Sequence, residues 1–258
     1  MIPFFRKIRK KMADDNRPLK YMRYAIGEIV LVVIGILIAL QINNWNEERK
    51  NDASENQYYC LILDDLKMNH NKIQELIVAS NNKVKVSKEL LLELNSGKKD
   101  KNFLLNKFLE AFRGEAFVPR NVTFNDLVSS GNIRLLKDDR IKNSLIQFYS
   151  ELENKVSHLK QNNQESSKQA FNLVNSSIEF GLSEFDYVNR LLGEEITQTL
   201  PDIDWSKDRN SEYYKDFQLM LVFNITMTDR NKQVMNEIIR LIEEPHNLLS
   251  KKCEDSIK

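Results

Sequence analysis

The side chains that most often carry catalysis are few and scattered in this sequence. The three histidines, His70, His158 and His246, fall on separate predicted helices, and no serine or cysteine forms a recognisable nucleophile motif. Adjacent acidic residues point about 100° apart on a helix, so such pairs do not converge as a general acid and base. Four such pairs occur: Asp64-Asp65, Asp138-Asp139, Glu194-Glu195 and Glu243-Glu244. We therefore predict no catalytic residue and no enzyme activity.

A calcium loop is suggested by Asp202-x-Asp204-x-Ser206 but is not completed. Its sixth position is Lys207 where glycine is needed, and its twelfth is Tyr213 where a bidentate glutamate is needed. We expect instead that Asp204 or Ser206 caps a helix and that the neighbouring tryptophan fills the bundle. The prediction is no metal and no cofactor.

The chain contains two cysteines, Cys60 and Cys253, far apart in sequence. Two cysteines cannot form a structural zinc site alone, and no histidine pair stands at ligand spacing. In an oxidising compartment they can form a disulfide, whereas elsewhere they are two separate thiols. The sequence leaves these alternatives open.

Residues 24–42, YAIGEIVLVVIGILIALQI, are long and apolar enough to cross a membrane. Nineteen residues at a rise of ~1.5 Å span about 29 Å, close to the thickness of a bilayer core. Glu28 opposes insertion but lies near one end, where a charge costs less than at the centre. No small-x-small cleavage pattern follows the segment, which favours an uncleaved signal anchor over a signal peptide.

Charge predicts the orientation of this segment. Residues 1–23 carry a net charge of +6, whereas the remainder carries −5. The positive-inside rule places 1–23 in the cytoplasm, 24–42 in the inner membrane and 43–258 in the periplasm. The first dozen residues are either an amphipathic interfacial helix or a basic tail. The body has no basic face that would predict nucleic-acid binding, so the bilayer is the expected partner.

One face of the predicted transmembrane helix collects Glu28, Val32, Gly35, Ala39 and Ile42. Gly35 and Ala39 form a small-xxx-small pair, which lets two helices approach closely, and a glutamate on that face can hydrogen-bond to a partner. We predict an interface here with a second copy or with another membrane protein. The alternative is that the glutamate reaches the cytoplasmic interface and the face has no partner.

The remaining sequence predicts an all-α fold, an elongated helical bundle of three long helices and two short ones. Glycine and proline are scarce, and apolar residues recur at three- and four-residue spacings. The first long helix ends at Asn95-Ser96-Gly97, a short one covers 102–112, and another opens with a capping box at Thr123–Asp126. The second long helix covers about 138–180 with Asp138 as its cap. Ser206 caps the third, which Pro245 kinks or ends. The seam of the first helix is predicted at Tyr59, Ile62, Leu66, Ile73, Leu76, Val84, Leu91 and Leu94, with Asn69 and Ser80 at intermediate positions.

A basic head, the span with its trailing NNWNE, and the later TFNDLVSSGNIRLLKDDRIKNSLIQFY together resemble a known family. It consists of uncharacterised single-pass membrane proteins of Bacteroidetes-type bacteria, a domain of unknown function. The resemblance covers nearly the whole chain. It implies the topology and a helical fold, and it supplies no catalytic residue.

Two functions follow from these features. The first is a membrane-tethered, non-enzymatic interaction or scaffold module. The second is a sensor ectodomain that holds a ligand between helices near residues 114–121 and 181–205. Because the cytoplasmic segment is only about 23 residues, such a sensor has to signal through a membrane partner.

Overall fold

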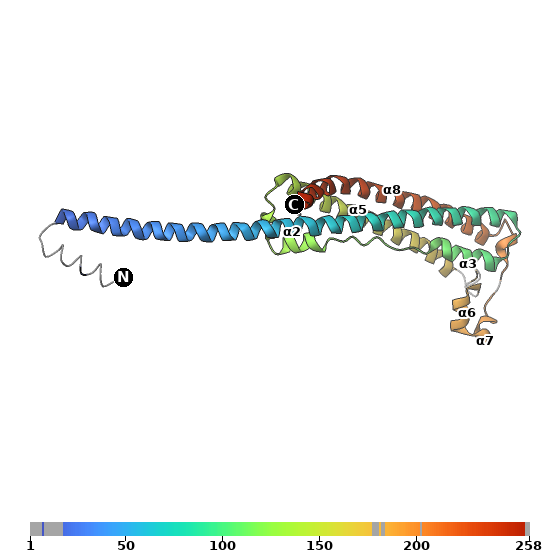
Figure 1. Cartoon of the computed structure of the whole chain (residues 1–258). Helices are drawn as coiled ribbons and strands as arrows, with labels where there is room; N and C mark the ends of the chain where they lie inside the picture. The colour runs from blue at the N-terminus through green and yellow to red at the C-terminus, as the bar shows by residue number, and fades with distance from the viewer. Residues whose placement is uncertain (1–6, 8–17, 177–180, 182–183, 202, 256–258) are drawn as a thin grey trace. The chain divides into compact units, whose positions relative to one another are not determined.

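The computed structural model of the chain describes residues 7, 18–176, 181, 184–201 and 203–255. The expected basic head and its interfacial helix lie mostly outside these residues, as do Asp202 and the predicted helix end at 177–180. All regular elements described are helices (Figure 1). They are α2 (Pro18–Ser96), α3 (Lys101–Phe112), α4 (Val122–Ser129), η1 (Asn132–Leu135), α5 (Asp139–Ser176), α6 (Asp186–Leu192), α7 (Glu194–Thr197), η4 (Trp205–Lys207) and α8 (Glu212–Asp255). The all-α prediction is confirmed.

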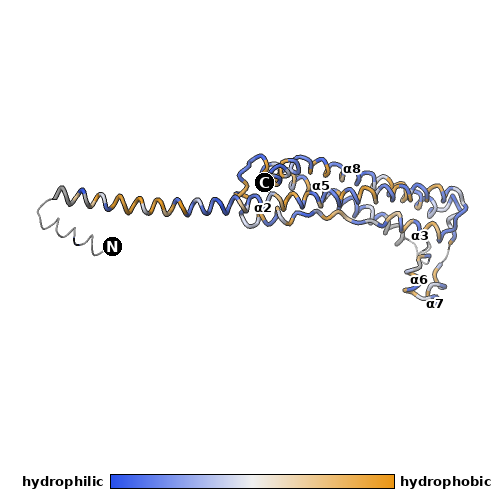
Figure 2. The backbone as a smooth tube through the Cα atoms, in the orientation of Figure 1, coloured by the Kyte–Doolittle hydropathy of each residue, from blue (hydrophilic) through white to orange (hydrophobic). Residues whose placement is uncertain are grey.

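The chain divides into two compact units, Met1–Glu55 and Asn56–Lys258, with α2 contributing to both. In the first unit every large apolar side chain from Ile26 to Ile42 is exposed. Figure 2 shows this stretch of α2 as mostly hydrophobic. Among the helices described, α2 is the one long and apolar enough to cross a membrane, and none of its most apolar window is buried. By length and composition it can be a membrane span or a signal anchor.

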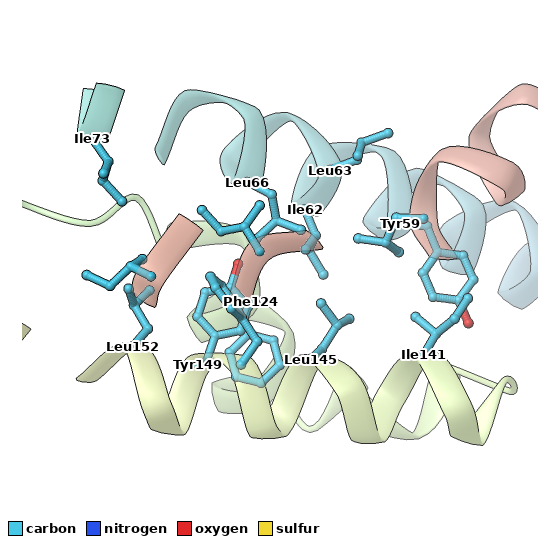
Figure 3. Packing of buried hydrophobic residues seen from close by; sticks show 14 of the residues in the cluster. Tyr59, Ile62, Leu63, Leu66, Ile73, Phe124, Ile141, Leu145, Tyr149 and Leu152 are labelled. Atoms are coloured by element: carbon cyan, nitrogen blue, oxygen red, sulfur yellow. The ribbon is translucent and has the colours of Figure 1, made fainter. Parts of the chain in front are cut away.

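In the second unit the three long helices, α2, α5 and α8, pack against one another through buried apolar residues, and all three contribute to the larger of two apolar clusters. The segment of α2 in this unit is about 60 Å long at ~1.5 Å per residue, which matches the 44 residues of α8. Figure 3 shows Tyr59, Ile62 and Leu66 of α2 facing Ile141 and Leu145 of α5. Met235, Ile238 and Ile242 complete this cluster from α8. Burial of the apolar stripes therefore holds the bundle together.

An extended segment, residues 113–121, joins α3 to α4 and is fixed to α2 by one amide side chain. Asn69, which is 2% exposed, donates to the carbonyl of Arg120 at 2.8 Å and accepts from its N–H at 2.7 Å. Asp65 accepts from the Arg120 guanidinium at 3.2 Å and from the Thr123 N–H at 3.3 Å. These two side chains of α2 satisfy backbone groups that would otherwise be left unpaired.

Two expected helix caps are wrong, and two others are confirmed. Thr123 lies inside α4, whose N-cap Asn121 makes no side-chain hydrogen bond; Asp65 of α2 satisfies the first turn instead of a local capping box. Ser206 lies in η4, six residues before α8 begins, and does not cap that helix. The alternative cap, Asp204, is confirmed, because it caps η4 and accepts from the Ser206 N–H at 3.2 Å. Asp138 does cap α5, accepting from the Ile141 N–H at 3.2 Å.

Other boundaries follow the sequence more closely. The first long helix ends at Ser96, and Gly97 takes a left-handed conformation with φ 66°. The expected helix at 102–112 is α3, preceded by the cap Asp100. Pro245 lies inside α8, which continues to Asp255, so the proline does not end the helix. The buried Trp205 fills the core between α3 and α8, as expected.

Cys60 and Cys253 form a disulfide across 193 residues of sequence, with their Cα atoms 5.6 Å apart. This resolves the alternative that the sequence left open. The bridge ties the last turns of α8 to the start of the bundle segment of α2, next to Tyr59 in the larger core cluster. Closing so long a loop stabilises the fold by roughly 5 kcal/mol in the chain-entropy account.

We predict that Asn69→Ala lowers the free energy of unfolding by about 2–3 kcal/mol, because the N–H and the carbonyl of Arg120 both lose the partly buried hydrogen bonds to this side chain. Chemical denaturation followed by circular dichroism measures the change. The control is Asn71→Ala, an exposed asparagine on the same helix, which should change it by less than about 0.5 kcal/mol. Equal effects of the two substitutions would contradict the proposed role of Asn69.

We predict that Tyr149→Phe leaves stability unchanged or raises it by up to about 1 kcal/mol. The Tyr149 hydroxyl is buried without a hydrogen-bond partner among the described residues, and burial, with Asp65 nearby, raises its pKa. Tyr214→Phe is the matched control; its hydroxyl bonds to Asn95 Oδ1 at 3.2 Å, so we expect a loss of about 1 kcal/mol. Thermal denaturation of both variants checks the contrast, and a clear loss in Tyr149→Phe would refute it.

Candidate ligand cavity

The buried seam of α2 keeps a regular spacing of three and four residues, but about halfway along it changes from apolar to polar side chains. Through the second unit it passes along Tyr59, Ile62, Leu66, Asn69, Ile73, Leu76, Ser80, Lys83, Ser87, Leu90 and Leu94. Ser80 and Ser87 are buried and Lys83 is half-buried. The predicted seam residues Val84 and Leu91 are only partly buried, because the seam runs through the preceding residues, Lys83 and Leu90, instead.

The facing helices, α5 and α8, also carry polar side chains at this level of the bundle. On α8 the buried seam continues through Asn224 and Thr228, with Asn231 half-buried. Asn224 donates to Ser87 Oγ at 3.0 Å and to the carbonyl of Ala111 at 3.1 Å. Asn231 donates to Asn163 Oδ1 of α5 at 2.9 Å. These hydrogen bonds bring the polar positions of α2, α5 and α8 into one layer, which we call the polar layer.

The polar layer separates two apolar clusters. One cluster extends from Tyr59 to Leu76 on α2 and packs on α4, α5 and the last part of α8. The other extends from Val86 to Leu94 on α2 and packs on α3, Trp205 and the first part of α8. The apolar core is therefore interrupted where all three long helices carry polar side chains.

A cavity of about 430 Å³ lies at the polar layer. Its apolar side consists of Phe108, Leu109, Phe112, Ala116 and Phe185. Its polar side consists of Lys83, Arg113, Glu115, Asn163, Ser166, Ser167, Tyr187, Asn224, Thr228 and Asn231. Cavities of this size with an apolar wall and a few convergent polar groups are typical of small-molecule sites.

The charges on the cavity wall are unbalanced. Among the described residues the side chains of Lys83 and Arg113 form no hydrogen bond or ion pair, and burial lowers the pKa of the Lys83 ammonium. The Glu115 carboxylate binds Lys72 at 2.5 Å, which holds the pKa of Glu115 below its usual value. Glu115 is therefore already paired, and neither the half-buried Lys83 nor the exposed Arg113 has a counter-ion among the side chains that the structure describes.

The residues predicted as a transmembrane interface lie apart from this cavity, in the first unit. Val32, Gly35, Ala39 and Ile42 are exposed and Glu28 is half-exposed, all on the continuous helix α2. Helical geometry places them on one face, and no atom of the described chain lies within 4 Å of a Cβ built on Gly35. Their interface stays a prediction.

Sequence reasoning did not select the cavity residues, although a signal for them exists. The predicted seam includes Asn69 and Ser80 as intermediate positions, but it then takes Val84 instead of Lys83, omits Ser87, and takes Leu91 instead of Leu90. Strict three- and four-residue spacing from Leu76 leads through Ser80, Lys83 and Ser87 to Leu90. The irregular segments expected to border a ligand do contribute, since Gly114–Ala116, Phe185 and Tyr187 line the cavity.

The described residues contain no cluster of His, Cys, Asp and Glu able to hold a metal ion. His158 is exposed, and His70 and His246 are half-buried on α2 and α8. None of the three lines the cavity. The charged and polar side chains that line the cavity can make ionic and hydrogen-bonding contacts with a ligand.

These features define an all-α protein with one apolar N-terminal helix and a cavity in its helical bundle. The chain belongs to a family of unknown function, DUF6090, whose family model matches residues 28–186. The match begins within the apolar segment and ends at the start of α6. No curated protein and no solved structure matches the chain.

Proposed function

We propose that this protein is a membrane-anchored binding module whose helical body lies outside the cytoplasm, in the periplasm. The disulfide between Cys60 and Cys253 carries the proposal. Disulfides persist in oxidising compartments and are rare in the cytosol. A chain that joins a stable disulfide to an uncovered apolar helix is best explained by a body exported across the membrane that the helix spans.

The charge distribution supports this orientation of the membrane span. The net charge of +6 in residues 1–23 favours a cytoplasmic N-terminus, and the segment directly after the span has few basic residues that would favour the reverse orientation. Trp45, 65% exposed, lies three residues beyond the apolar stretch, at the level expected for an interfacial aromatic side chain. The membrane is then the inner membrane, crossed once.

We predict that the native protein carries no free thiol and that its body is reached only from outside the cytoplasm. In intact spheroplasts, an alkaline phosphatase fusion after Asp255 should be active and a fluorescent-protein fusion there should be dark.

A thiol-reactive maleimide should label Cys60 and Cys253 only after reduction. The single variant Cys253→Ser and the double variant should lose equal stability, about 3–5 kcal/mol. Labelling without reduction, or an inactive phosphatase fusion, would overturn the compartment assignment.

The module acts by binding and is not an enzyme. A scaffold or interaction role needs a surface that meets a partner, and the exposed face of Glu28, Val32, Gly35, Ala39 and Ile42 offers one inside the bilayer. Small residues there let a second helix approach closely. The partner is a second copy of the chain or another membrane protein.

We predict that Ala39→Cys forms a crosslinked adduct in membranes under mild oxidation, and that adding Gly35→Leu abolishes it by blocking close approach. The matched control is Leu37→Cys, which lies about 200° from Gly35 around the same helix. Non-reducing electrophoresis reads the adduct and its mass distinguishes a second copy from a different partner. Equal yields of crosslinked adduct from Ala39→Cys and Leu37→Cys would contradict the predicted interface.

A second candidate function is a sensor that binds a ligand and acts through that membrane partner. One observation favours it, namely the cavity of about 430 Å³ at the polar layer. The bundle segment of α2, which contributes Lys83 to the cavity, is continuous in sequence with the apolar span. A ligand that alters the packing of α2 can therefore influence the helix that meets the partner.

A further inference from the structure

We propose that the cavity binds a small organic anion with an aromatic or other apolar body, and that the Lys83 ammonium is its counter-ion. The inference rests on the second candidate function, a ligand-binding body, and names the class of ligand. Three features of the cavity wall lead to it: its charge, its free hydrogen-bond donors and its aromatic side.

The positive charge on the cavity wall favours binding of an anion. Lys83 occupies a seam position between the two apolar clusters, where a cation without a partner is costly. The nearest carboxylate on the cavity wall, Glu115, is bound by Lys72. Arg113 adds a second unpaired cation at the same cavity. A bound carboxylate or similar anion would supply the charge that the described protein groups do not.

The remaining polar groups offer donors more than acceptors. The Asn224 amide N–H groups are directed to Ser87 and Ala111, and Asn231 and Asn163 are bonded to each other. These asparagines thus form the structural part of the layer. The donors left for a ligand include the Lys83 ammonium and the Arg113 guanidinium, together with the hydroxyl groups of Ser166, Ser167, Tyr187 and Thr228. Donors of this kind bind carboxylate oxygens with charge-assisted hydrogen bonds.

Part of the cavity wall is aromatic. Phe108 and Phe112 lie with ring centroids 4.2 Å apart, and Phe185 lines the same cavity. A ligand with a planar apolar body can pack against these rings while its charged group reaches Lys83. A fully hydrated ion such as inorganic phosphate would leave this wall exposed to water, so the ligand is amphipathic.

The backbone at Gly114 lies close to the end of the Lys83 side chain. A Cβ placed on Gly114 would lie 3.1 Å from Lys83 Nζ, tighter than ordinary contact, so the glycine leaves room for the ammonium beside the backbone. A side chain at this position would move the ammonium without removing it. Gly114 is therefore a positioning residue for the anion site.

The test uses full-length protein in nanodiscs of zwitterionic phosphatidylcholine, with empty nanodiscs as the blank. The probes are 3-phenylpropanoate and its uncharged isostere 3-phenylpropanamide, each titrated by calorimetry. Octanoate and phenyl phosphate form further arms that vary the apolar body and the anionic group. We expect 3-phenylpropanoate to bind at least tenfold more tightly than the amide.

The variants separate binding from folding. Lys83→Met should reduce the affinity for 3-phenylpropanoate at least tenfold and leave the amide unchanged. The melting temperature without ligand should be equal or higher, because an unpaired, partly buried charge is removed. Gly114→Ala should also weaken the anion while retaining the lysine. The control Lys85→Met, two residues along α2 on an exposed side chain, should bind like wild type.

Each outcome decides one part of the proposal. If the amide binds as tightly as the anion, or if Lys83→Met does not discriminate them, the anion site is wrong although the cavity still binds ligands. If none of the probes binds wild-type protein, the proposed ligand class is rejected. If the anion binds through Lys83 but does not change the Ala39→Cys crosslink, the ligand class stands and the sensor function fails.

Discussion

The structure of the body depends on one constraint, the continuous seam of α2 that must stay buried against α5 and α8 over about 60 Å. A helix of this length keeps one face inward only if its buried positions recur every three and four residues without interruption. In this chain the spacing holds from Tyr59 to Leu94 even where the residue type changes. The helices therefore stay in register across the polar layer, which separates two apolar cores without ending the bundle.

Two further contacts fix the ends of that arrangement. At one end the disulfide of Cys60 and Cys253 joins the first and last helices of the bundle, so that α8 cannot fray from α2. Nearer the middle, Asn69 replaces the hydrogen bonds that the extended segment 113–121 would make with water. This segment runs from the pinned Arg120 to Gly114 beside Lys83. The placement of the cavity wall thus follows from contacts made outside the cavity.

Much of the fold could be predicted because its signals are local. Apolar periodicity, the stop at Gly97, the cap at Asp138 and the apolar stretch at 24–42 each depend on a few neighbouring residues. The predictions are wrong or incomplete where contacts between residues far apart in the sequence determine the structure. Asp65 satisfies the start of α4 across 58 positions of sequence, so a local capping box at Thr123 was the wrong solution. The sequence does not predict the short helices α6, α7 and η4 individually. It also cannot decide whether the two cysteines pair, because their distance depends on the whole fold.

The polar layer is hardest to explain as a structural necessity. Leucine or isoleucine at Ser80, Ser87, Asn224 and Thr228 would extend the two apolar cores into one and bury more apolar surface. A polar layer can instead specify helix register, and the asparagines suit that role, because Asn224 donates to Ser87 and Ala111 and Asn231 donates to Asn163. Lys83 does not, because an unpaired cation adds cost without fixing any partner among the described residues. Register explains the asparagines and leaves the lysine, the adjacent glycine and the cavity to be explained together. A ligand that brings its own negative charge accounts for all three.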